Sequence, residues 1–142
     1  MKIYIASSWK NEKECITLAN LLRLDGHEVD CFCDKNSGRL FNFNDLPDIT
    51  GRNGITILDE PIVQKAFTED KKWIDWAEAV VLLLPCGKSA HLEAGYAKGR
   101  NKQLFILGEF PKGEFDVMYG FADGLFRSSE FLRYKLQGVV KR

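Results

Sequence analysis

The sequence lacks the features that mark nucleic-acid-binding and membrane proteins. Its 142 residues carry 20 basic and 20 acidic side chains, so the formal net charge is zero. Without an excess of positive charge, binding to nucleic acid or to an anionic membrane gains no electrostatic support, and we expect neither partner. No apolar run approaches the length that crosses a bilayer. The apolar segment in MKIYIASSWK is too short for a signal-peptide core, so a cytoplasmic protein is expected.

Residues that commonly bind metals are also scarce. The chain has two histidines and four cysteines, and no two cysteines form a C-x-x-C pair. His91 has no Cys or His partner at ligand spacing. Cys31 and Cys33 alternate along an expected strand, a pattern typical of buried free thiols. We therefore expect neither a metal site nor a cofactor.

Short apolar runs alternate with helical patterns along the chain. The run AVVLLLP is continuously apolar, which is typical of a parallel strand covered on both faces. The alternation and the short links predict an open, mostly parallel α/β sheet of flavodoxin or Rossmann type, with helices on both faces, in one domain over residues 1–142. Strands are expected at 2–7, 27–33, 79–85, 103–109 and 124–128, and helices at 11–26, 67–79, 91–99 and 129–142.

Polar side chains follow several of the expected strands. In open α/β sheets, ligands bind beyond the carboxyl ends of the strands. The segments YIASSW, PCGKSAHLE and GEFPKGEFD start or end at that edge, so they bring together Tyr4, Ser7, Glu93 and Asp116.

Each of the candidate residues also has an ordinary structural interpretation. Glu93 is expected in the first turn of a helix, where the dipole favours an ionised carboxylate; it is either a helix-start charge or a catalytic group. Tyr4, taken alone, is a core tyrosine. Asp70, taken alone, is a charge or cap at a helix N-terminus.

Four segments in sequence order resemble the nucleoside 2-deoxyribosyltransferase family, which includes 2′-deoxynucleoside 5′-phosphate N-hydrolases. They are IYIASSW, Asp70 with Ala77 before an apolar strand, PCGKSAHLEAGYAKG, and GEFDVMY. The resemblance implies that Glu93 is the nucleophile, that Tyr4 orients it, and that Asp70 serves the departing or incoming base.

The resemblance also implies a set of substrate contacts. Asp116 falls where members place a polar residue that reaches the 5′ end of the sugar from a neighbouring subunit, so a homo-oligomer is expected. Ser7, Gly87 and Ser89 are the other substrate contacts expected at the strand ends, and Phe43 is expected as a contact from the long loop considered next, not from the resemblance. At Gly87, members often carry serine or aspartate, so one contact is missing here. Because a carboxylate would repel a 5′-phosphate, Asp116 predicts a preference for free 2′-deoxynucleosides.

The long segment between Asp34 and Glu60 is polar and contains glycine, and such loops are usually functional. Within LFNFNDLPD, Phe41 or Phe43 is expected to stack on the base, and Asn44 or Asp45 to bond it. The alternative is that both phenylalanines anchor the loop to the core.

The residue types suit cleavage of an N-glycosidic bond without a cofactor. A carboxylate can trap the oxocarbenium-like sugar as an ester, and a second carboxyl group can protonate the leaving base. The prediction is transfer of 2-deoxyribose between nucleobases. The alternatives are hydrolysis of nucleosides or their 5′-monophosphates, cleavage of NAD, and a nucleotide-sensing module without turnover.

Overall fold

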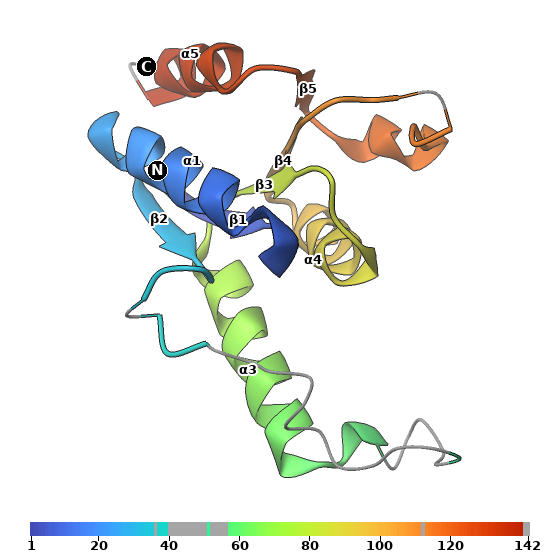
Figure 1. The fold of residues 1–142 in the computed structure, drawn as a ribbon. Helices are drawn as coiled ribbons and strands as arrows, with labels where there is room; N and C mark the ends of the chain where they lie inside the picture. The colour runs from blue at the N-terminus through green and yellow to red at the C-terminus, as the bar shows by residue number, and fades with distance from the viewer. Residues whose placement is uncertain (36, 40–50, 52–56, 112, 141–142) are drawn as a thin grey trace.

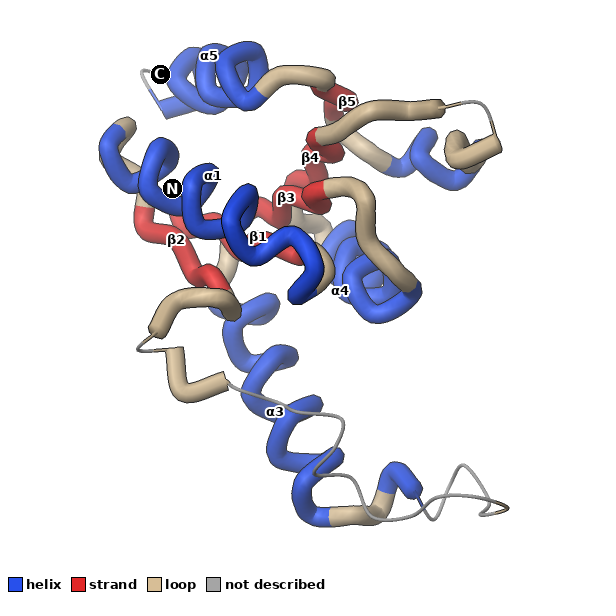
Figure 2. Tube along the Cα trace, in the orientation of Figure 1, coloured by secondary structure: helices blue, strands red, loops and turns tan. Residues whose placement is uncertain are grey.

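The computed structural model describes residues 1–35, 37–39, 51, 57–111 and 113–140. Within this part of the chain, five strands form a single parallel sheet in the order β2-β1-β3-β4-β5 (Figures 1 and 2). The strands are β1 (Lys2–Ala6), β2 (Glu28–Cys31), β3 (Ala79–Leu83), β4 (Gln103–Leu107) and β5 (Gly124–Phe126). The open parallel α/β sheet predicted from the sequence is confirmed.

Helices cover both faces of this sheet (Figure 1). Buried side chains of α1 and α5 pack with Ile3 and Ile5 on one face, and those of α3 and α4 pack on the other, with Tyr4 and Ala6. The alternation along β1 thus turns Tyr4 towards α4. The helices are α1 (Glu12–Leu24), α3 (Pro61–Trp76), α4 (Lys88–Gly99) and α5 (Ser129–Val140), with short 3-10 turns η1 (Trp9–Asn11) and η3 (Val117–Phe121).

The strand order places a topological switch point between β1 and β3. From β1 the chain moves outward to β2, then returns to the other side of β1 as β3. The connections therefore leave these two neighbouring strands in opposite directions, and a crevice opens at their carboxyl ends. The segments after β1 and β3 contain the sequence motifs singled out above.

Two helices begin earlier than the sequence predicted. α3 begins at Pro61, whose ring suits the first helical position, so Asp70 lies in the middle of the helix and is no N-terminal cap. Phe67, the first residue of the helix predicted at 67–79, is 61% exposed. α4 begins at Lys88, so Glu93 is in its second turn.

Phe43 and the rest of LFNFNDLPD lie outside the described residues. Cys15, Cys31 and Cys33 are buried free thiols, as the sequence predicted for the latter two. None of the helices in the described ranges has the length and apolar character needed to cross a membrane.

Candidate active site

The centre of the candidate site is a hydrogen bond between Tyr4 and Glu93. Tyr4 is 2% exposed in β1, and its phenol donates to Oε2 of Glu93 on α4. Burial and the Glu93 charge raise the pKa of Tyr4 far above its ordinary value. Tyr4 therefore stays protonated and holds the Glu93 carboxylate as a donor.

The electrostatics of Glu93 differ from the sequence prediction. A first-turn position would have favoured the ionised form through the helix dipole, an effect that fades beyond that turn. Burial instead raises the pKa of Glu93 to about 7, and the Tyr4 hydrogen bond opposes the rise. At neutral pH the carboxyl group is thus poised between acid and carboxylate. Perturbed values of this kind gather at functional sites.

Asp70 supplies a second carboxyl group to the same site. It projects from α3, and its side chain is 46% exposed, which leaves it accessible to a ligand. Partial burial raises the pKa of Asp70, while the positive charge of Arg39 lowers it. The negative charge of Asp70 in turn raises the pKa values of both Tyr4 and Glu93, so the three groups form one electrostatic unit.

Arg39 belongs to this site and was missed by the sequence interpretation. Its guanidinium is buried, donates from Nη2 to Oδ2 of Asp30 at 2.6 Å, and places Nε 4.0 Å from Oδ1 of Asp70. Asp30 is the β2 partner of Tyr4 in the sheet register. The signal in the sequence that could have indicated a buried cation was Asp30, because a carboxylate at an inward-facing strand position needs a positively charged partner.

Ser7 joins the ends of β1 and β3. Its hydroxyl donates to the carbonyl oxygen of Leu83 at 2.7 Å and accepts from Nδ2 of Asn11 at 3.3 Å. Asn11 also donates to the carbonyl oxygen of Pro85 at 2.5 Å. These bonds fix the two strand ends from which the segments around Tyr4 and Glu93 emerge.

Gly87 and Ser89 lie at the start of α4 and are exposed. Gly87 has open space where a side chain would be, so a serine or aspartate would fit there. The carbonyl oxygen of Gly87 accepts from Nδ1 of His91 at 2.7 Å, and Nε2 of His91 lies 2.9 Å from the Tyr119 hydroxyl. His91 is therefore engaged in fixing the helix start. In the described residues, no cluster of His, Cys, Asp and Glu side chains could hold a metal ion.

Asp116 lies apart from these groups within the chain. It caps η3, accepting from the backbone N–H of Met118 at 2.8 Å, and is exposed. It lines an open cavity of about 950 Å³ with His91 and Tyr119. Tyr4, Asp70 and Glu93 are not among the described residues that line this cavity.

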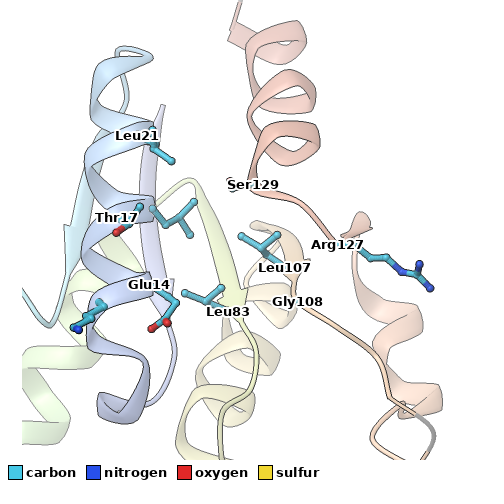
Figure 3. A pocket seen from close by; sticks show the side chains of 10 residues that line it. Glu14, Thr17, Leu21, Leu83, Leu107, Gly108, Arg127 and Ser129 are labelled. Carbon is cyan, nitrogen blue, oxygen red and sulfur yellow. The ribbon is translucent and has the colours of Figure 1, made fainter.

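A second cavity, of about 320 Å³, lies on the opposite face of the sheet (Figure 3). Glu14, Thr17 and Leu21 of α1 line one side, and Leu107 and Ser129 line the other. Its lining among the described residues includes neither Tyr4 nor Glu93. The paired carboxyl groups and their tyrosine donor, rather than cavity size, identify the candidate active site.

Sequence comparison found neither a matching protein family nor a matching curated protein. Among solved structures, the chain is similar to a 2-deoxyribosyltransferase from Bacillus psychrosaccharolyticus, at 18% identity and a TM-score of 0.67, covering 94% of this chain and 90% of that one. It is also similar to the CMP N-glycosidase BcmB of Clostridium botulinum, at 15% identity and a TM-score of 0.59, covering 96% and 97%. The resemblance inferred from the sequence is thus confirmed for the fold: the chain has the fold shared by these two enzymes.

Proposed function

We propose that the protein cleaves the N-glycosidic bond of 2′-deoxynucleosides and transfers the sugar to another nucleobase. The observation that carries the proposal is the buried Tyr4–Glu93 hydrogen bond at the β1/β3 switch point, with Asp70 on the adjoining helix. Binding alone does not require a buried carboxyl group whose pKa lies near neutral pH beside a second acid, whereas catalysis does. The two structural neighbours, a deoxyribosyltransferase and an N-glycosidase, support the same class of chemistry.

In the first step, ionised Glu93 attacks C1′ of the sugar. A C1′–O bond to Glu93 forms while the C1′–N bond breaks, and the departing base keeps the electron pair and takes a proton from Asp70. The raised pKa of Asp70 favours the protonated form that this role needs. Tyr4, which remains protonated, fixes the orientation of the attacking carboxylate.

In the second step, a ring nitrogen of an incoming base attacks C1′ of the deoxyribosyl ester. Glu93 leaves as a carboxylate, and Asp70 accepts the proton that the incoming base releases, which restores the starting state. A 2′-deoxy sugar suits both steps, because no electron-withdrawing hydroxyl group destabilises the positive charge that develops at C1′.

Hydrolysis is the second candidate, and the likeness to a CMP N-glycosidase supports it. In that case water attacks the ester, and the substrate is a nucleoside or its 5′-monophosphate. Incubation with a panel of deoxynucleosides, with and without a free base, followed by chromatography separates the candidates. New nucleoside indicates transfer; free base with free sugar indicates hydrolysis; no change across the panel favours a sensing module.

The proposed active form is a homo-oligomer in which Asp116 reaches the sugar of a neighbouring subunit. Asp116 is exposed, and the cavity that it lines does not include Glu93 among its described lining residues, which supports a contact made across a subunit interface. The segment around it (orange in Figure 1) exposes large apolar side chains of the kind that oligomer interfaces bury. These side chains are Phe115, Val117, Met118 and Phe121.

A further inference from the structure

Arg39 is a buried arginine with most of its hydrogen-bonding capacity unused. Its side chain is 4% exposed, and its guanidinium carries five N–H donors and a permanent charge. Nη2 donates to Asp30, but Nε and Nη1 are buried and have no hydrogen-bond partner among the residues that the structure describes. Leaving a buried donor unsatisfied is destabilising, and more so when the donor belongs to a charged group. Among the explanations for such a group, an acceptor supplied by a ligand fits its position beside the candidate active site.

The guanidinium lies on the Asp70 side of the candidate site. Its Cζ atom is 6.0 Å from the centre of the Tyr4 ring and 5.8 Å from a ring of Trp73. Its Nε atom is 4.0 Å from Asp70, too far for a hydrogen bond between them. Since Asp70 is the group proposed to protonate the leaving base, Arg39 is placed beside the base rather than beside the 5′ end of the sugar.

The surroundings of Arg39 favour a neutral acceptor over a phosphate. Three carboxyl groups, those of Asp30, Asp70 and Glu93, interact electrostatically with Arg39. A phosphate dianion placed here would be repelled by these groups in a partly dry site. A carbonyl oxygen carries no formal charge, and its two lone pairs accept from a donor-only guanidinium.

We propose that Arg39 donates to an exocyclic carbonyl oxygen of the nucleobase and makes the protein prefer oxo bases. This inference rests on the proposed function and names the substrate class of that site. An amino group in the same position would place its N–H donors against the N–H donors of Arg39 and leave the guanidinium without an acceptor. A site discriminates most strongly against a base that leaves its buried polar groups unpaired. As the C1′–N bond breaks, negative charge spreads onto the carbonyl oxygen, and the fixed positive charge of Arg39 stabilises it.

The test measures binding of hypoxanthine and adenine, which share a purine frame and differ in a 6-oxo or 6-amino group. Calorimetric titration of wild type is expected to give at least ~10-fold tighter binding of hypoxanthine. In Arg39→Gln the ratio is expected to fall to within ~3-fold, because an amide offers an acceptor as well as a donor. Equal binding of both bases by wild type, or an unchanged ratio in Arg39→Gln, overturns the proposal.

Asp30→Asn is the matched control, because it removes the same ion pair but keeps the guanidinium. Preference for hypoxanthine is expected to persist in this variant; its loss there would show that Arg39 acts only through the Asp30 pair and would also overturn the proposal. Turnover of 2′-deoxyinosine by wild type is measured separately. Absence of turnover counts against the proposed function, whereas the binding ratio decides the role of Arg39 independently of catalysis.

Discussion

Tyr4 and Glu93, 89 positions apart in the sequence, are joined by a hydrogen bond from the phenol to the carboxyl group. The bond connects β1, on the face of the sheet that is covered by α3 and α4, to the second turn of α4. Two effects on the pKa of Glu93 oppose each other: burial raises it, and the hydrogen bond from the Tyr4 phenol lowers it. The reactivity of Glu93 is therefore set by its partner as well as by its position.

Removing the Tyr4 hydroxyl should shift the pH dependence of the reaction. Since the Tyr4 bond favours the ionised form, Tyr4→Phe should raise the pKa of Glu93 above about 7 and move the ascending limb of kcat/KM to higher pH. Tyr119→Phe, which removes a hydroxyl bonded to His91, is the matched control and should leave the limb in place. An unmoved limb in Tyr4→Phe would refute the assigned role of Tyr4.

The ionisation of Glu93 should also appear in the stability of the fold. Because its folded-state pKa is raised, its stabilising contribution is complete below about 4.5 and is lost as the pH rises through about 7. Glu93→Gln carries no such dependence. Between pH 4.5 and 8, the wild type should thus lose on the order of 3 kcal/mol of unfolding free energy relative to Glu93→Gln.

Urea denaturation across this pH range measures the difference. Glu12→Gln, which removes an exposed carboxyl group from α1, is the matched control. A constant difference between wild type and Glu93→Gln across the range would show that Glu93 is not buried in its protonated form.

Asp70→Asn should discriminate between leaving groups. Substrates whose base leaves poorly depend on protonation, so their kcat/KM should fall by ~10²-fold or more, whereas activated bases should be nearly unaffected. Lys72→Met, on an exposed position of the same helix, controls for changes in α3. Equal losses on both kinds of substrate would mean that Asp70 positions the substrate instead.

The fold was largely predictable because its signals are local. Continuous apolar character marked β3, and the alternation of apolar runs with helical patterns marked the order of strands and helices. The starts of α3 and α4 could not be predicted in this way. Pro61 and Gly87 are residue types typical of loops, and only the structure shows that a helix begins at or directly after each of them. The predicted starts were six residues late for α3 and three residues late for α4, and this changed the chemistry, because Asp70 and Glu93 lie farther from the helix N-termini than predicted.

Only those site residues could be predicted that belong to motifs whose order along the sequence resembles the family. Tyr4 and Glu93 meet as the resemblance implied, and Asp70 interacts electrostatically with both. Arg39 could not be found in this way, because it lies in irregular chain after β2. Its place depends on contacts with Asp30 and Asp70, which only the tertiary structure brings together.

Asp116 should influence the choice between nucleosides and their monophosphates. An ionised aspartate accepts from a 5′-hydroxyl group but repels a 5′-phosphate, so wild type should cleave free 2′-deoxynucleosides faster than the matching monophosphates. Asp116→Ser should narrow this preference, whereas Glu114→Gln, at a neighbouring exposed carboxyl group, should not. Faster cleavage of monophosphates by wild type would contradict the role given to Asp116 and favour the hydrolase.

The most direct test of the central claim is mass spectrometry of the protein after reaction with a slow 2′-deoxynucleoside in the absence of an acceptor base. We expect a 2-deoxyribosyl adduct on the peptide that contains Glu93, which should disappear with formation of a new nucleoside when a free base is added. Glu93→Ala should fold, form no adduct and lose ~10³-fold or more in kcat/KM. Absence of an adduct on an active wild type, together with Glu93→Ala activity within tenfold of wild type, would contradict the assignment of Glu93 as the nucleophile.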